Sequence, residues 1–214
     1  MLQGPVVPPA SGGAARSIVI LLHGYGSNGD DLIGLVPYWR AALPDTVFVS
    51  PNAPQVCPGA PGGYQWWPLT TFTPEARAAG ARAAAPVIDA FIDAQLARYG
   101  LTQDRLALVG FSQGTMMALH VGPRRERPLA GIVGYSGRLA DPASPAAELK
   151  TRPPVLLVHG DADPMVPVAA LQQAQAALTP LGFDVATHVS PGLGHSIDEV
   201  GLRLGERFLS RVLA

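Results

Sequence analysis

The sequence predicts an α/β protein with a mostly parallel sheet and helices on both faces of that sheet. Two observations support this fold class. Short apolar runs rich in β-branched residues alternate with longer segments of helical period, which is the pattern of repeated strand–helix units whose strands are buried on both faces. In addition, 214 residues with 48% hydrophobic and 14% charged side chains supply enough apolar material for one large core.

The regular elements begin after a segment of different composition. Residues 1–16 are rich in Pro, Gly, Ala and Ser without an apolar period, so we expect an irregular N-terminal segment followed by a single domain over residues 17–214. The apolar runs predict strands over residues 17–22, 46–50, 105–109, 130–135, 155–158 and 185–189. The segments of helical period predict helices over residues 31–42, 74–99, 114–121, 167–178 and 197–213.

Local signals define several helix boundaries. Thr73 followed by Pro74 predicts a helix start, because Pro at the first helical position loses an N–H that has no helical acceptor. Pro86 is expected to kink or split the same helix. Ser196 and Glu199 form an S-x-x-E pattern, which predicts a capping box at the start of the last helix.

Charge and composition exclude several classes of function. Fifteen basic and sixteen acidic residues give a net charge of −1 without basic blocks, so we expect no nucleic-acid partner. The longest strongly apolar stretch, residues 18–22, is too short to span a membrane, and the N-terminus lacks a basic-then-apolar signal pattern. We therefore expect a cytoplasmic protein without stable membrane insertion. The single cysteine, Cys57, cannot form an internal disulfide, and we expect an unreactive thiol.

A glycine pattern suggests one possible function. Residues 24–29 read G-Y-G-S-N-G and match G-x-G-x-x-G between a predicted strand and a predicted helix, as in dinucleotide-binding proteins. Such a site also needs an acidic residue near the end of the second strand, where this chain has V-S-P-N at residues 49–52. A tight turn with another purpose is the better interpretation.

A second pattern predicts a nucleophile. Residues 110–114 read G-F-S-Q-G and match G-x-S-x-G, with a predicted strand before them and a predicted helix after them. The flanking glycines allow the sharp turn that would expose Ser112 at the carboxyl end of the strand. Ser136, within G-Y-S-G, lacks the second glycine at the required offset, so we interpret it as part of an ordinary turn.

A nucleophilic serine on such a turn needs a carboxylate and a histidine that follow it in this order. Of the five histidines, only His195 follows the candidate acid within a loop, whereas His188 lies inside a predicted strand. Asp161 and Asp163 both follow the fifth predicted strand. We prefer Asp163 as the acid, because Asp161 can more readily bond turn amides. A metal site at His159, Asp161 and Asp163 is the alternative, but no further His/Cys cluster supports it, and we expect no metal.

Acyl transfer also needs backbone N–H donors for the oxyanion of the tetrahedral intermediate. One donor is the amide after the nucleophile, Gln113, and Tyr25 in the glycine-rich turn is the candidate for the second. His23 is interpreted as a structural residue that holds this turn. Because His195 would lose its function on taking up a proton, activity is expected to decline in acid.

Four segments together resemble the phospholipase/carboxylesterase family of α/β-hydrolases, which includes acyl-protein thioesterases and small bacterial carboxylesterases. They are residues 22–26 (L-H-G-Y-G), 110–114 (G-F-S-Q-G), 159–167 (H-G-D-A-D-P-M-V-P) and 194–196 (G-H-S). The resemblance implies the α/β-hydrolase fold without a separate lid domain and a cofactor-independent enzyme. It also implies a triad of Ser112, Asp163 and His195, with the Tyr25 and Gln113 amides as the oxyanion hole.

The same resemblance implies a substrate groove near the Pro/Gly-rich loop of residues 51–68. We expect Trp66, Trp67, Leu69 and Val166 to bind the substrate there, since apolar and aromatic walls are usual in small-molecule sites. The alternative is that Trp66 and Trp67 only hold the loop against the core. Related thioesterases often carry an acidic residue where this chain has Pro68 and Leu69, which favours small to medium acyl esters as substrates. Thioesters, lysophospholipids and acylated proteins remain alternative substrates, and a dinucleotide-binding protein or a non-catalytic binding module would be a different class of function.

Overall fold

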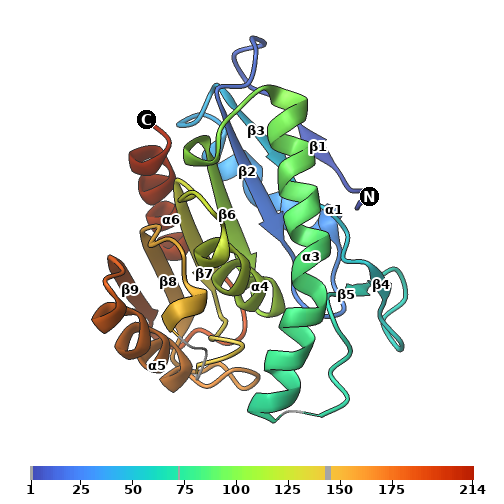
Figure 1. Cartoon of the computed structure of the whole chain (residues 1–214), viewed down its shortest axis with the longest axis vertical. Coiled ribbons are helices and arrows are strands. Elements are labelled where there is room, and N and C mark those ends of the chain that lie inside the picture. Colours follow the sequence, from blue (N-terminus) through green and yellow to red (C-terminus); the bar gives the residue numbers. More distant parts are fainter. Residues whose placement is uncertain (1, 72, 143–145) are drawn as a thin grey trace.

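A seven-stranded sheet forms the centre of the computed structural model, in which residues 2–71, 73–142 and 146–214 are described (Figure 1). Its strands are parallel except for β1, which pairs antiparallel with β3. In spatial order they are β1 (Val6–Val7), β3 (Thr46–Val49), β2 (Ser17–Leu22), β6 (Leu106–Phe111), β7 (Gly131–Tyr135), β8 (Val155–Gly160) and β9 (Val185–Ser190).

The six predicted strands are confirmed, and their ends shift by at most two residues. Three two-residue strands were not predicted, because a strand of that length has no measurable apolar period. One of them, β1, extends the sheet from the N-terminal segment expected to be irregular, where Val6 pairs with Val49. The other two, β4 (Gln55–Val56) and β5 (Tyr64–Gln65), form a small antiparallel hairpin within the long loop.

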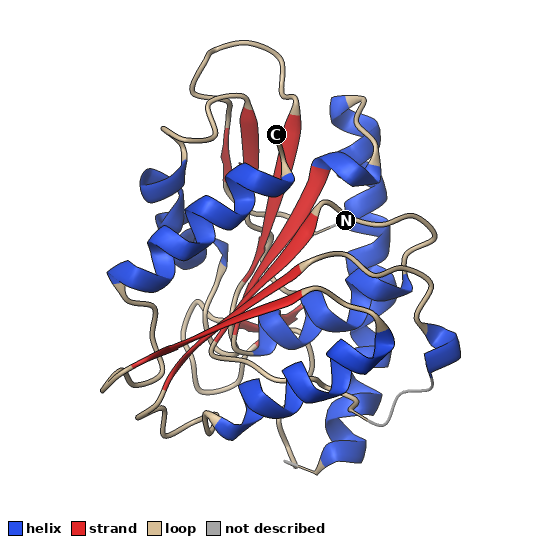
Figure 2. Ribbon diagram, turned by 90° about the vertical axis from the view of Figure 1, so that its left-hand side faces the viewer, coloured by secondary structure: helices blue, strands red, loops and turns tan. Residues whose placement is uncertain are grey.

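Helices cover both faces of the sheet, as predicted (Figure 2). The alternation along β2 shows why: Ile18, Ile20 and Leu22 belong to one apolar cluster, and Val19 and Leu21 belong to the other. The first cluster is covered by α3 (Pro74–Tyr99), α4 (Gln113–Val121) and α5 (Ala169–Leu178). The second is covered by α1 (Gly29–Leu32), α2 (Val36–Trp39) and α6 (Glu199–Val212). Short 3₁₀ turns are η1 (Ile33–Leu35), η2 (Gln103–Arg105), η3 (Gly122–Arg124), η4 (Ala146–Glu148) and η5 (Thr179–Leu181).

Two predictions for the helices were wrong. The helix expected over residues 31–42 is instead the series α1, η1 and α2, because Pro37 lies in the first turn of α2 and cannot donate a helical hydrogen bond. The capping box at Ser196 is also absent. The N-cap of α6 is Asp198, whose carboxylate accepts a 2.7 Å hydrogen bond from the Gly201 amide.

The long helix α3 begins where the sequence predicts. The Thr73 hydroxyl accepts a hydrogen bond from the Ala76 amide at 3.2 Å, and Pro74 occupies the first turn. Pro86 does not split this helix, which continues to Tyr99.

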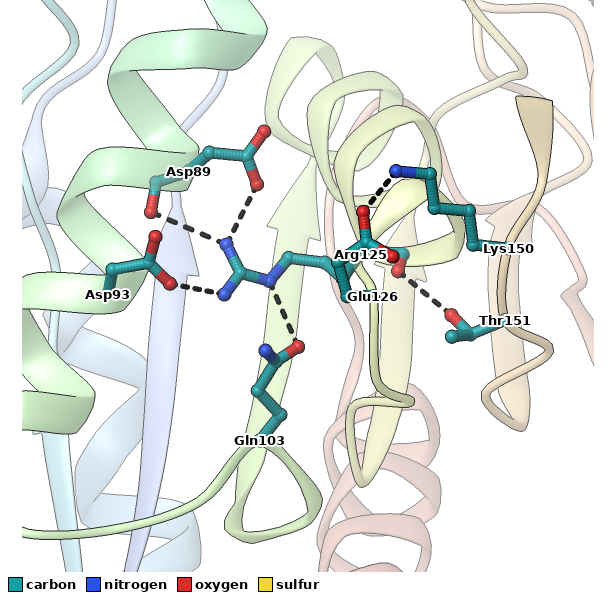
Figure 3. A network of polar contacts seen from close by, with 8 residues as sticks. Asp89, Asp93, Gln103, Arg125, Glu126, Lys150 and Thr151 are labelled. Carbon is teal, nitrogen blue, oxygen red and sulfur yellow. Dashed lines mark hydrogen bonds and ion pairs between the residues drawn. The ribbon is translucent and has the colours of Figure 1, made fainter.

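A buried arginine ties α3 to the segment that follows α4 (Figure 3). Arg125 donates to the Asp89 carboxylate at 2.9 Å and to the Gln103 side chain at 3.1 Å, and it forms an ion pair with Asp93. Burial alone would lower the pKa of Arg125, but the two carboxylates outweigh it and raise the pKa. This network holds α3 against the core on the same face as α4.

No helix in the described part of the chain is both long and apolar enough to cross a membrane. Among the described residues, no separate lid covers the carboxyl edge of the sheet. The loops that follow β2, β6, β7 and β8 meet at this edge, as expected for parallel strands.

Candidate active site

Ser112 occupies the sharp turn between β6 and α4. Its backbone has φ 52° and ψ −112°, a conformation that is strained for a residue with a side chain. The Ser112 amide donates to the Tyr135 carbonyl at 2.9 Å, which holds the turn against β7. The strand, turn and helix that the G-x-S-x-G pattern predicts are therefore present around Ser112.

Glycines allow this turn to pack tightly. A Cβ atom at Gly114 would lie 1.7 Å from the Leu22 carbonyl oxygen, and one at Gly110 would lie 2.4 Å from the Thr115 nitrogen. A Cβ atom at Gly24 would lie 3.4 Å from the Ser112 Cβ atom. The glycine-rich turn after β2 thus lies directly beside the candidate nucleophile.

Asp163 and His195 are joined by a hydrogen bond. His195 Nδ1 donates to Asp163 Oδ2 at 2.7 Å, while the Met165 and Val166 amides donate to Asp163 Oδ1 at 2.8 and 2.9 Å. Complete burial of the side chain would raise the pKa of Asp163, but the hydrogen bonds from Val166, His195 and Met165 outweigh it and lower the pKa. Asp163 is therefore a carboxylate at neutral pH and can orient the imidazole of His195.

Asp161, the other candidate acid, has a separate task. Its carboxylate accepts a 2.6 Å hydrogen bond from the Gly192 amide and so braces the loop that leads to His195. This contact agrees with the amide-bonding role that was expected for Asp161.

The imidazole of His195 lies near the serine turn. The ring of Phe111, the residue before Ser112, has its centroid 4.9 Å from that of His195. Ser136 supports the loop of His195, because its buried hydroxyl donates to the Ser196 carbonyl at 3.2 Å. Ser136 has a positive φ of 47°, so its backbone is strained like that of Ser112.

His159, which the sequence suggested only as an alternative metal ligand, has a supporting role that sequence reasoning did not identify. It is buried at the end of β8, and its Nε2 atom lies 2.8 Å from the Val166 carbonyl and 3.3 Å from Asp163 Oδ2. These contacts hold the turn that carries the acid. The only signal in the sequence is that His159 stands four residues before Asp163.

His23 holds the glycine-rich turn, in agreement with its expected structural role. Its Nδ1 atom donates to the Gly24 carbonyl at 2.7 Å, and its Nε2 atom accepts from the Ala53 amide at 2.9 Å. This pair of contacts requires a neutral imidazole, and burial lowers the pKa of His23 accordingly. The indole of Trp66 donates to the His23 carbonyl at 2.9 Å.

The Gln113 side chain has a role beyond that of its amide. It accepts from the Trp66 amide at 3.0 Å and donates to the Trp67 carbonyl at 2.9 Å. The Gln113 amide, in the first turn of α4, has no carbonyl acceptor within the helix. Tyr25, in the glycine-rich turn after β2, is 40% exposed. A hydrogen bond with the Cys57 thiol raises the pKa of the Tyr25 hydroxyl.

The residues expected to bind substrate lie in different environments. Trp66 and Trp67 are buried, and the Trp67 indole lies 2.2 Å from where a Cβ atom of Gly80 would be. Both tryptophans line a cavity of about 660 Å³ between the long loop and α3. Leu69 packs against the core, and Val166 is buried behind Asp163.

The glycine pattern of residues 24–29 serves contacts within the protein. The Gly26 amide donates to the Tyr64 carbonyl at 2.9 Å, and the Gly29 amide donates to the Asn52 side chain at 2.7 Å. The helix that follows, α1, has only four residues. These contacts support the interpretation of a tight turn with another purpose.

Comparisons with known proteins identify the family of this chain. A family model described as Phospholipase/Carboxylesterase matches residues 5–213. Esterase YpfH of Escherichia coli K12 is 31% identical over 86% of this chain and 78% of its own length. Acyl-protein thioesterase 1 of Gibberella zeae is 29% identical over 98% of this chain and 95% of its own length. The crystal structure of esterase PE8 shares 49% identity and a TM-score of 0.95, and covers 99% of both chains. The chain has the α/β-hydrolase fold of these structures, and it belongs to the phospholipase/carboxylesterase family.

Proposed function

We propose that this serine hydrolase cleaves carboxylic esters of small to medium acyl chain length through an acyl-enzyme on Ser112. His195 acts as the base and Asp163 as the acid that orients it. The observation that carries the proposal is the 2.7 Å hydrogen bond between Asp163 and His195. The imidazole of His195 also contacts the ring of Phe111, the residue before the strained Ser112.

The reaction follows from these positions. The Ser112 hydroxyl attacks the ester carbonyl while His195 Nε2 takes its proton, and the tetrahedral intermediate expels the alcohol, which receives that proton. Water then attacks the acyl-enzyme with His195 again as base, and this step releases the acid and restores the hydroxyl. Asp163 stabilises the imidazolium that forms in both steps.

The amides of Gln113 and Tyr25 are proposed to form the oxyanion hole. The Gln113 amide has no acceptor within α4, and the turn that contains Tyr25 packs against Ser112 through Gly24. Such donors, held rigid by His23 and the Gln113 side chain, stabilise the developing negative charge without reorganisation.

We further propose that Trp66, Trp67, Leu69 and Val166 shape the site for the acyl group. For the two tryptophans, support comes from the mainly apolar cavity of about 660 Å³ that they line and from the hydrogen bonds that join both to the Gln113 side chain, next to Ser112. Hydrolysis of protein thioesters is the second candidate function, favoured by the match to acyl-protein thioesterase 1 over 98% of this chain. The match to a family described as Phospholipase/Carboxylesterase favours lysophospholipids as a further substrate class within the same mechanism.

The remaining features of the proposal concern the setting of the reaction. We propose that residues 17–214 act as one catalytic domain that needs neither metal nor cofactor, in the cytoplasm, without a nucleic-acid partner. The near-zero net charge and the single cysteine support this.

The test compares the native protein with Ser112→Ala on 4-nitrophenyl esters of increasing chain length and on a palmitoyl thioester. We expect kcat to fall by about 10⁴-fold or more, because the nucleophile is removed while the fold is kept. Ser11→Ala, at an exposed loop serine, is the control and should retain full activity. Labelling of the Ser112→Ala variant by a fluorophosphonate probe, or unchanged hydrolysis, would contradict the proposal.

A further inference from the structure

Arg138 is a half-buried cation without a described partner. It follows β7 by three residues, and its guanidinium forms no hydrogen bond or ion pair with any residue in the described ranges. Burial lowers the pKa of Arg138, and the positive charge of neighbouring Arg77 lowers it further. Withdrawing an arginine from water without a partner is unfavourable, which is a reason to look for a ligand.

The backbone places Arg138 beside the candidate nucleophile. A Cβ atom at Gly137 would lie 3.0 Å from the Ser112 carbonyl oxygen. The Cα atom of Arg138 follows that of Gly137 at about 3.8 Å, the spacing of consecutive Cα atoms. The charge of Asp163 also acts on Arg138, so the guanidinium is within electrostatic range of the acid. Arg138 therefore belongs to the same edge of the sheet as Ser112 and Asp163.

The nearby carboxylates are already engaged by other groups. Asp163 is bonded to His195 and to two backbone amides, and Asp141 forms an ion pair with Arg82. Arg138 lines a small cavity of about 40 Å³ together with Arg77, Gln173 and four apolar residues, and no acid is among them. The cavity beside Arg138 thus has no acid in its lining and has room for a carboxylate-sized group.

We propose that Arg138 binds a carboxylate carried by the substrate, so that the preferred substrates are esters with a negative charge near the scissile bond. The inference rests on the proposed function of Ser112 and adds a substrate class to it. The planar guanidinium can bond both oxygens of a carboxylate, which a lysine ammonium cannot do in the same geometry. Substrate binding would then supply a partner that none of the described residues supplies to Arg138.

The test uses two esters of equal chain length, 4-nitrophenyl hydrogen glutarate and 4-nitrophenyl pentanoate. Arg138→Gln should lower kcat/KM for the glutarate by about tenfold to a hundredfold, because a hydrogen-bonded charge pair is lost, and should change the pentanoate value by less than about threefold. Arg138→Lys should restore part of the glutarate activity. The control is Arg98→Gln, which removes the same charge from an exposed site near the end of α3, at the opposite edge of the sheet.

A second pair, 4-carboxyphenyl butyrate and phenyl butyrate, places the carboxylate on the alcohol side instead. A selective loss in either pair supports the proposal and shows which side of the ester meets Arg138. Equal effects of Arg138→Gln on charged and neutral esters in both pairs would overturn it. That result leaves the proposed function intact if neutral esters are still hydrolysed, whereas failure of the proposed function appears as activity in Ser112→Ala.

Discussion

At the scale of single residues, two neighbouring aspartates of the site differ in the groups that they contact. Asp163 has both oxygens engaged around His195 and the turn of Val166, whereas Asp161 bonds the Gly192 amide. Both acids follow β8 and both accept bonds from amides. Of these two acids only Asp163 bonds the imidazole, so Asp163 is the one whose charge would stabilise a protonated His195 in the proposed reaction.

Asp163→Asn is expected to lower kcat by about 10³- to 10⁴-fold with little change in KM, because an amide cannot hold the imidazole in the tautomer that accepts the serine proton. The matched control is Asp161→Asn, whose side-chain oxygen can still accept from Gly192 and whose kcat should stay within a few-fold of the native value. Steady-state kinetics on one short-chain ester measures both. Similar losses in the two variants would contradict the assigned roles.

At the scale of elements, contacts between loops decide the geometry of the site. Two side chains hold the loop that contains β4 and β5 by hydrogen bonds to its backbone. They are His23, which directly follows β2, and Gln113, the first residue of α4. The helix α3 packs beside it through Trp67. This arrangement joins three separate segments around Ser112.

Pro86 is a weak point within α3 that does not serve the site. It is exposed in the interior of a 26-residue helix, where proline removes a backbone hydrogen bond. Pro86→Ala should raise the free energy of unfolding by about 1–3 kcal/mol, since the helix bond is regained and little packing is lost. Urea denaturation measures the gain, and ester hydrolysis should be unchanged. A lower stability of Pro86→Ala would show that the ring itself supports the helix.

At the scale of the whole molecule, a buried histidine outside the proposed mechanism affects the stability of the fold. His120 lies in α4 and has no part in the proposed mechanism. Burial lowers its pKa to about 4, with a further contribution from the charges of Arg124 and Arg82. The unfolded chain takes up this proton below about pH 6.5, whereas the folded protein takes it up only near pH 4.

The free energy of unfolding should therefore fall as the pH drops from about 6.5 towards 4, and His120 should account for about 2 kcal/mol between pH 7 and pH 5. His23, whose pKa is also lowered, contributes in the same direction. His120→Gln should reduce the pH dependence, which urea denaturation of both proteins at the two pH values measures. Parallel stability curves for the native protein and the variant would contradict this origin.

The sequence by itself determined the order of the main elements, and it predicted the chemistry that we propose for the site. Apolar periods identified six strands, and the glycines around Ser112 predicted the turn that the structure contains, because burial and tight turns restrict which residues can occupy these positions. The order of serine, acid and histidine along the chain was also readable. Short strands such as β1 and the break at Pro37 were missed or misjudged, because their signals extend over too few residues.

The tertiary structure decided which side chains meet. The contact between Asp163 and His195, the supporting bonds of His159 and Ser136, and the hydrogen bonds of the Gln113 side chain all depend on how neighbouring strands and loops are placed. A periodic pattern reports which face of an element is buried, but it does not report the position of that element relative to its neighbours. Hydrogen bonds act over about 3 Å, so they depend on that relative position, which exists only when the sheet is assembled.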